Sequence, residues 1–239
     1  MTLCVEDETA ISLRNRLSRA TLGMRNRLSS DGRGRFRVCE VVHNPAYIRR
    51  PMRIIAGEFR GRRLLPPEGD TTRPITDRVK QSLFDILSPG MKDAIVYDCF
   101  AGTGSMGLEC LSRGAKFATL FEADWSAFKR LQRNITAIDV GDRCKVVAGN
   151  LFQWFDAQAD AKRGDGVDLI FLDPPYRFLR ERQDDLRGLA RHFVRSHLKA
   201  DGMVIFRHDA KDTLDLPGLK PTDLREYGGM TLEFLQATP

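Results

Sequence analysis

The sequence lacks the features that would mark a metalloprotein, a disulfide-rich secreted protein or a membrane protein. Its five cysteines are widely spaced and include no CxxC pair, and its four histidines show no metal-ligand spacing. No run of about 18 apolar residues occurs, and acids stand where a secretory signal would be apolar. We therefore expect a cytoplasmic protein with no metal and no membrane span.

Lysine is absent from residues 1–51, which carry ten arginines and five acids. The other 188 residues hold 28 basic and 27 acidic groups, so most of the net charge of +6 belongs to the N-terminal segment. We predict that 1–51 is a basic, disordered extension and that one domain occupies 52–239, with Met52 as an alternative start of the protein. Because that domain is nearly neutral, overall charge does not argue for a nucleic-acid partner.

Strands and helices alternate from Met52 onward, which predicts an α/β fold with a doubly wound, mostly parallel sheet. Two short strands at 53–56 and 62–65 predict a small N-terminal β-hairpin within 52–65, and 224–227 with 231–235 predict a C-terminal one. The remaining strands are expected at 95–99, 118–122, 145–148, 168–172 and 203–206. Helices are expected at 76–87, 105–113, 124–138, 151–155 and 179–198.

A glycine-rich turn joins the strand at 95–99 to the next helix in "VYDCFAGTGSMGLE", with Gly102, Gly104 and Gly107 spaced as GxGxxG. Glycines let a backbone approach a ligand closely, and the helix N-terminus offers free N–H groups. Glu122 closes the following strand, where an acid accepts ribose hydroxyls. This pattern indicates a nucleoside cofactor, NAD or S-adenosylmethionine, or else a tight turn without a ligand.

Neighbouring residues favour S-adenosylmethionine. Asp98 and Phe100 stand just before the glycines, and a carboxylate there would repel a pyrophosphate but suit a cationic sulfonium. Asn150 follows the third strand, so its amide could read the adenine edge or cap the helix that starts at Leu151. Both roles are compatible with a bound ligand.

The stretch "LIFLDPPY", residues 169–176, ends a buried strand on a carboxylate and stiffens the backbone after it. Asp173 and the carbonyl of Pro174 could accept the two N–H bonds of an exocyclic amine and free its lone pair. Pro175 adds rigidity, and Tyr176 could stack on the base. We predict that these four residues are catalytic and that they transfer a methyl group to an amine.

Several motifs in register resemble class I methyltransferases, and more closely the RsmD family of bacterial 16S ribosomal RNA guanine-N2 methyltransferases. The resemblance covers residues 52–235 and rests on "RIIAGEFRGRRL", "RPITDRVKQSLFDIL", "DCFAGTGSMGLECLSRGA", "FEAD" and "FLDPPY". It implies a seven-stranded Rossmann-like sheet, S-adenosylmethionine as donor and a guanine N2 amine of the small subunit as target. It also implies that Gly102 and Gly104 line the methionine moiety, Glu122 the ribose and Asn150 the adenine.

A ribosomal RNA partner requires a basic surface, and two stretches offer one. The first is the N-terminal hairpin and the helix after it, where we predict RNA contacts from Arg53, Arg60, Arg62, Arg63, Arg73 and Arg78. Arg73, in the loop before that helix, could instead order the active-site pocket. The second is an i, i+4 stripe, which we interpret as a solvated helix face, formed by Arg187, Arg191, Arg195 and Lys199.

The sequence is also compatible with other substrates and other functions. The same amine chemistry would serve DNA adenine or cytosine, or a protein glutamine amide. An NAD-dependent oxidoreductase would leave the "DPPY" segment without a role, and a non-catalytic RNA-binding module would leave Asp173 without one. We expect a monomer that acts on ribosomal RNA within the small subunit or an assembly intermediate.

Overall fold

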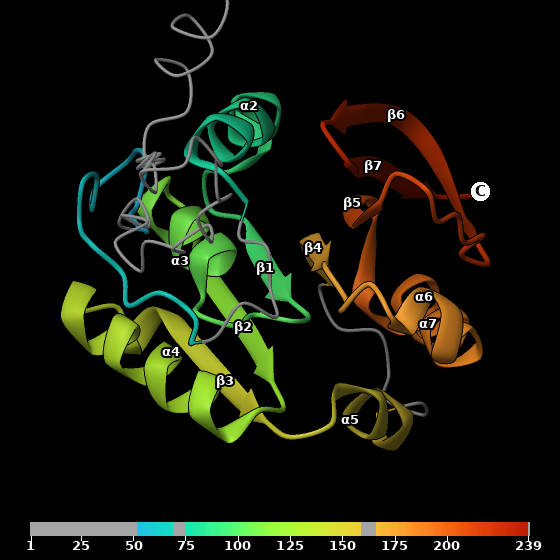
Figure 1. Ribbon diagram of the computed structural model, residues 1–239, viewed down its shortest axis with the longest axis horizontal. Helices are drawn as coiled ribbons and strands as arrows, with labels where there is room; N and C mark the ends of the chain where they lie inside the picture. Colours follow the sequence, from blue (N-terminus) through green and yellow to red (C-terminus); the bar gives the residue numbers. More distant parts are fainter. Residues whose placement is uncertain (1–51, 69–74, 159–165, 239) are drawn as a thin grey trace, which may run out of the picture. The chain divides into compact units, whose positions relative to one another are not determined.

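The computed structural model describes residues 52–68, 75–158 and 166–238 (Figure 1). Their centre is a seven-stranded sheet of order β3-β2-β1-β4-β5-β7-β6. The first five strands in that order run parallel, and β7 pairs antiparallel with both β5 and β6. The strands are β1 Ile95–Asp98, β2 Phe117–Glu122, β3 Cys144–Ala148, β4 Val167–Leu172, β5 Leu198–Asp209, β6 Leu219–Tyr227 and β7 Met230–Ala237. The predicted doubly wound, mostly parallel sheet is confirmed.

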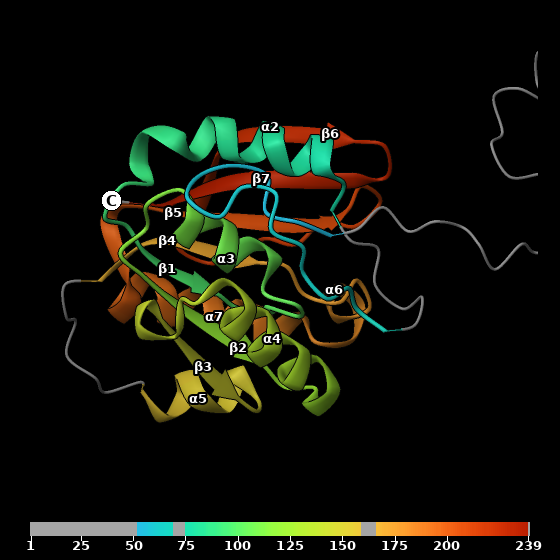
Figure 2. The ribbon, with the colours of Figure 1, turned by 90° about the vertical axis from the view of Figure 1, so that its left-hand side faces the viewer.

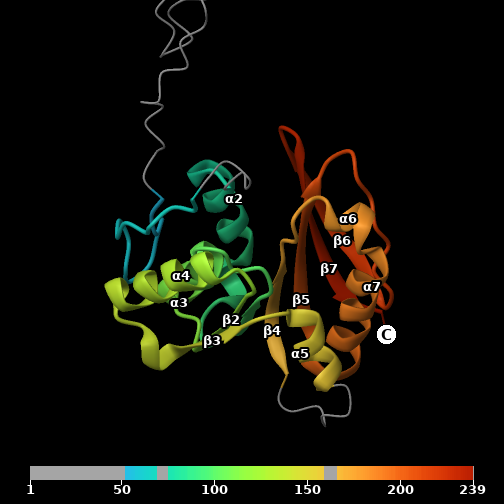
Figure 3. The ribbon, with the colours of Figure 1, turned by 60° about the horizontal axis from the view of Figure 1, so that its bottom comes forward.

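Helices cover both faces of the sheet (Figure 3). One apolar core joins it to α2 Asp77–Leu87, α3 Ser105–Ser112 and α4 Trp125–Ile138. A second core joins the other face to α5 Leu151–Ala157, α6 Phe178–Glu181 and α7 Gln183–His192. Short turns η1 Ser88–Gly90 and η2 Gly141–Arg143 complete the connections. None of the helices in the described part of the chain is long and apolar enough to cross a membrane.

Local capping places the helix starts where the sequence predicts them. The Thr76 side chain accepts a hydrogen bond from Val79 N, and the Asp124 side chain accepts one from Ala127 N at 2.8 Å. Each bond satisfies a first-turn N–H group that has no partner within the helix. The helices α2 and α4 therefore begin directly after these residues.

The prediction of a single helix over residues 179–198 is wrong. Arg182 leaves the helical conformation, with φ −136° and ψ 38°, and separates α6 from α7. Its guanidinium instead lies over the rings of Phe152 and Phe178, at 4.3 and 5.1 Å. The helical path ends in a π-helical turn, η3 Phe193–His197, and Leu198 already pairs with Val167 as the start of β5.

Residues 52–65 make a hairpin turn without regular strands. A single antiparallel bridge joins Arg53 to Arg63 where two short strands were predicted. The N–H groups of Ile55 and Ala56 donate to the Glu109 carboxylate of α3, so they are not available to a strand ladder. The C-terminal hairpin is longer than predicted, because β6 and β7 pair from Leu219 to Ala237. It lies beside α2, where Ser82 Oγ and Tyr227 OH are 2.8 Å apart (Figure 2).

Candidate active site

The glycine turn lies between the carboxyl end of β1 and the start of α3, and its three glycines differ in what they permit. Gly102 has φ 54°, and a Cβ added there would point into open space. A Cβ at Gly104 would meet Leu131 Cδ1 at 2.5 Å, and one at Gly107 would meet Leu120 Cδ2 at 2.2 Å. Gly104 and Gly107 therefore serve the packing of the turn, and Gly102 keeps the open approach that a ligand needs.

Two carboxylates hold this turn in place. The Glu122 carboxylate accepts hydrogen bonds from Gly102 N and Asp124 N, both at 2.7 Å. The Asp98 carboxylate, only 2% exposed, accepts one from Gly107 N at 2.9 Å. The acids predicted to bind a cofactor thus lie on either side of the glycine turn and fix its backbone.

Acidic side chains gather at this carboxyl edge of the sheet. Burial raises the pKa of Asp98 to about 7, the Gly107 N–H opposes this rise, and the nearby Asp173 and Glu122 carboxylates add to it. Burial also raises the pKa of Glu122, against the hydrogen bonds from Asp124 N and Gly102 N. Because the Glu122 and Asp173 carboxylates make ionisation of Asp98 more costly, a nearby cation would favour its charged form.

Asp173 follows the last residue of β4 at the same sheet edge. Its Oδ2 accepts a hydrogen bond from Arg207 Nη1 of β5 at 2.9 Å, and the two side chains are 28% and 13% exposed. Burial raises the pKa of Asp173, and the Arg207 guanidinium lowers it in opposition. Arg207 was missed in the sequence, where the only signal is a cation inside the apolar run "MVIFRHD".

The two prolines lead from β4 into α6. The carbonyls of Pro175 and Tyr176 accept hydrogen bonds from Phe178 N and Leu179 N, at 2.8 and 3.2 Å. The carbonyl of Pro174 lies before this turn, next to Asp173, and Pro174 itself is buried. The segment therefore has a fixed backbone, with Asp173 and the Pro174 carbonyl as neighbouring acceptors.

Asn150 caps α5, which is the second of its two predicted roles. Its Oδ1 accepts a hydrogen bond from Phe152 N at 3.0 Å, so its NH₂ group is what remains to contact a ligand. The rings of Phe100, Phe152 and Phe178 lie edge to face or tilted beside it, with centroids 6.0 to 6.3 Å apart. These rings give the edge between β1 and β4 an apolar wall that suits a flat base.

A buried ion pair between α2 and α3 stabilises the start of the helix that follows the glycine turn. Lys80 Nζ of α2 lies 2.9 Å from Glu109 Oε2 of α3, and the two side chains are 2% and 0% exposed. Lys80 also donates to Ser105 Oγ, at the first residue of α3, and to the Arg53 carbonyl. One cation thereby joins α2, the N-terminal turn and the helix that follows the glycines.

The arginines predicted to bind RNA make different contacts. Arg53 pairs with Asp77 at 3.0 Å beside Arg63, whereas Arg62 Nη1 donates to the Ala137 carbonyl near the end of α4. The whole described set is exposed, that is Arg53, Arg60, Arg62, Arg63 and Arg78. Arg78 lines an open groove of about 540 Å³ between α2 and the β6–β7 hairpin. Arg73 lies outside the described residues.

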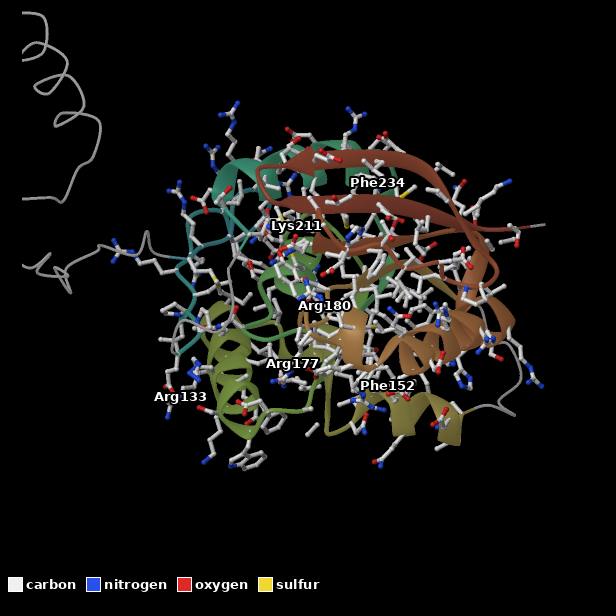
Figure 4. All side chains as sticks on the ribbon, turned by 45° about the vertical axis from the view of Figure 1, so that its right-hand side comes forward. Arg133, Phe152, Arg177, Arg180, Lys211 and Phe234 are labelled. Carbon is white, nitrogen blue, oxygen red and sulfur yellow. The ribbon has the colours of Figure 1, made fainter. Side chains whose placement is uncertain are left out.

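Other cations lie nearer the "DPPY" segment, and sequence reasoning passed over them. Figure 4 labels Arg177, Arg180 and Lys211 close to α6. Arg180 pairs with Asp212 at 3.1 Å, while Arg177 and Lys211 are exposed. Among residues 52–68, 75–158 and 166–238, no group of three or more His, Cys, Asp or Glu side chains could hold a metal ion.

The strand order and the carboxyl edge with its glycine turn define a Rossmann-like methyltransferase fold. The chain belongs to the family described as "Conserved hypothetical protein 95", whose model matches residues 52–236, and the predicted RsmD-type membership is confirmed.

Three relatives illustrate the match. "Ribosomal RNA small subunit methyltransferase D" of Escherichia coli is 41% identical over 126 residues, which are 53% of this chain and 61% of that protein. "Putative rRNA methyltransferase YlbH" of Bacillus subtilis is 32% identical over 70% of this chain and 86% of its own length. The structure of "Putative methyltransferase yhhF" from E. coli superposes with a TM-score of 0.64 at 29% identity, covering 78% of this chain and 98% of that one.

Proposed function

We propose that this chain is an S-adenosylmethionine-dependent methyltransferase that modifies the N2 amine of a guanine in small-subunit ribosomal RNA. The observation that carries the proposal is the pair of acceptors at the end of β4, where Arg207 holds the Asp173 carboxylate beside the rigid Pro174 carbonyl. The glycine turn of β1, the neighbouring strand, opens on the same edge. The family and the names of its E. coli and B. subtilis relatives support an rRNA substrate.

The donor fits the residues present at this edge. Bound there, S-adenosylmethionine would supply an electrophilic methyl group on a positively charged sulfur. Asp98, Glu122 and Asp173 provide the negative surroundings for that charge. The open side of Gly102 would admit the amino-acid portion, Glu122 would hold the ribose, and the Asn150 NH₂ with Phe152 would hold the adenine.

The acceptors prepare the substrate amine. Asp173 and the Pro174 carbonyl accept its two N–H bonds, which turns the nitrogen lone pair out of conjugation with the ring and toward the methyl carbon. The new N–C bond would replace the S–CH₃ bond of the donor, which would leave as a neutral thioether, and the nitrogen would lose one proton, which Asp173 is placed to accept. Tyr176 stacks on the base, and Arg207 orients Asp173.

A guanine inside a duplex cannot place its amine against Asp173, because its edge is paired and stacked. The target is therefore unpaired or flipped out of its helix. We propose a small subunit or an assembly intermediate as the substrate, and a monomer in the cytoplasm as the acting form.

Transfer of labelled methyl groups tests the proposal. Purified chain is incubated with labelled S-adenosylmethionine and small subunits that lack the modification, with duplex DNA and a glutamine-containing peptide as alternative acceptors. We expect label only in 16S RNA, at a guanine N2 by nucleoside analysis, and none with Asp173→Ala, which keeps Asp98 and Glu122 and so retains most of the donor affinity. Label in DNA adenine or in glutamine would replace the RNA assignment, and normal transfer by Asp173→Ala would remove Asp173 from catalysis.

A further inference from the structure

The residues of α4 are basic on balance. No Asp or Glu occurs between Trp125 and Ile138, and the helix has three cations. Arg130 is 10% exposed and neutralised by Glu68 at 2.9 Å. Lys129 and Arg133 are exposed, and neither makes an ion pair with any residue that the structure describes. Two uncompensated cations thus lie one helical turn apart on a solvent-facing surface.

An exposed indole begins the same face. Trp125 is 62% exposed, the largest value among the exposed large apolar residues of the described chain. Phe128 stacks on it at 5.0 Å between ring centroids and 14° between planes, and Lys129 Nζ lies 5.1 Å from the indole centroid. The ring is thereby held in one orientation although most of its surface faces solvent. A held, exposed aromatic beside cations is the arrangement on which nucleic-acid bases stack.

The position of this face connects the candidate active site to the hairpin turn. Trp125 directly follows Asp124, whose N–H bonds to Glu122, so the indole lies at the carboxyl edge of the sheet. Lys129 and Arg133 follow at successive turns, and Figure 4 shows Arg133 on the side of α4 turned away from the strands. Near the end of the helix, Arg62 reaches the Ala137 carbonyl.

We propose that the outer face of α4 binds a single-stranded RNA segment that flanks the target nucleotide. One unpaired base stacks on Trp125, and Lys129 and Arg133 contact the phosphates of the nucleotides that follow. This inference rests on the proposed RNA substrate and adds the path that the RNA takes. Charge complementarity selects RNA as the occupant, since a polyanion meets Lys129, Arg133 and an aromatic ring here, while Glu68 is paired with Arg130.

Binding of a fluorescein-labelled, unpaired RNA oligonucleotide tests the path, measured by anisotropy over a series of salt concentrations. For Trp125→Ala we expect affinity lower by roughly 5- to 100-fold with an unchanged salt slope, and partial rescue by Trp125→Phe. For Lys129→Ala/Arg133→Ala we expect the slope of log K against log salt to shrink by about 1.4, the value for two single-strand contacts. The matched control Arg191→Ala/Arg195→Ala removes two exposed arginines from α7 and η3 and leaves the slope unchanged.

Three results would overturn the proposal. RNA affinity that is unchanged in both α4 variants would remove the face from RNA binding. A loss of S-adenosylmethionine affinity in Trp125→Ala would place the indole in the donor site. Normal RNA binding together with lost methylation of assembled subunits would assign the face to a ribosomal protein. If the unaltered chain methylates no RNA, the proposed function fails, while the anisotropy measurement still decides whether α4 binds RNA.

Discussion

At the scale of single residues, Asp98 makes the edge sensitive to pH. Its folded pKa of about 7 lies above the value of about 3.9 in an unfolded chain, so it is neutral in the folded protein below pH 7. A cationic donor binds the ionised form better, because only that form carries a charge that attracts it.

We expect the affinity for S-adenosylmethionine to rise by up to about tenfold from pH 5.5 to pH 8, if the cation lowers the pKa of Asp98 by about one unit. Calorimetric titration across this range checks it. Asp98→Asn keeps an acceptor for Gly107 N–H and should bind with little pH dependence. A wild-type affinity that stays flat with pH would contradict the assignment.

The stability of the ligand-free protein should follow the opposite direction. Because the folded pKa of Asp98 is raised, its contribution favours folding at low pH and is lost as pH rises through about 7. We expect the midpoint of thermal unfolding to fall between pH 6 and pH 8, and to fall less in Asp98→Asn. Scanning calorimetry without ligand measures the difference.

We propose that Arg207, which pairs with Asp173, acts through it as a positioning residue. Without its guanidinium, burial would raise the pKa of Asp173 unopposed. We expect Arg207→Met to move the acidic limb of the kcat/KM profile to higher pH, and Arg207→Lys to leave it near the wild-type position. Profiles that superpose for all three proteins would mean that Arg207 only fills space.

Asp173 and Arg207 differ in how far the sequence alone could identify them as site residues. Asp173 could be predicted because its neighbours along the chain, Pro174 and Pro175, make its position unusual. Arg207 is 34 residues away, and it meets Asp173 only because β4 and β5 pair in one register. Partner choice across strands depends on that register, which local patterns do not specify.

At the scale of elements, the Lys80–Glu109 ion pair connects α2, α3 and the N-terminal hairpin turn. Burial lowers the pKa of Lys80, and the Glu109 carboxylate raises it in opposition. Glu109 also accepts hydrogen bonds from Ile55 N, Ala56 N and Arg113 Nε. Removal of the ammonium would leave a buried carboxylate with less compensation.

We expect Lys80→Met to lower the free energy of unfolding by about 3–5 kcal/mol, measured by urea denaturation. Arg225→Ala is a suitable control, because Arg225 pairs with Asp223 where both side chains are more than a third exposed. Its cost should stay within about 1 kcal/mol. Equal effects of the two substitutions would show that the buried pair is not specially important.

Prediction of elements succeeded where the signal was local. The bounds of α2 and α4 follow from the caps Thr76 and Asp124 and from helical periodicity. The break at Arg182 depends on Phe152, 30 residues earlier, and the start of β5 at Leu198 depends on pairing with Val167. Contacts distant in sequence decided these two boundaries, so periodicity alone extended the helix too far.

At the scale of the whole molecule, the charge is divided unevenly along the chain. The family match begins at Met52, and the first 51 residues hold most of the net charge of +6. The prediction of a separate N-terminal extension falls on residues outside the described ones. The packed cores of the described part are built from residue 54 onward.

Deletion of residues 1–51 should therefore leave most of the methyl-transfer activity and the unfolding midpoint of the domain intact. Activity on small subunits and thermal unfolding of the truncated chain measure this directly. A collapse of activity with an unchanged unfolding midpoint would make the N-terminal segment an RNA-binding element. A lower midpoint would instead make it part of the fold.

The negative edge formed by Asp98, Glu122 and Asp173 has a consequence for turnover. Loss of the methyl group would leave an uncharged thioether in place of a sulfonium, while Asp98 and Glu122 stay unchanged. The spent cofactor then loses part of the attraction that held the fresh one. The protein should accordingly discriminate against its own by-product, and exchange of cofactor after each cycle should be favoured by charge.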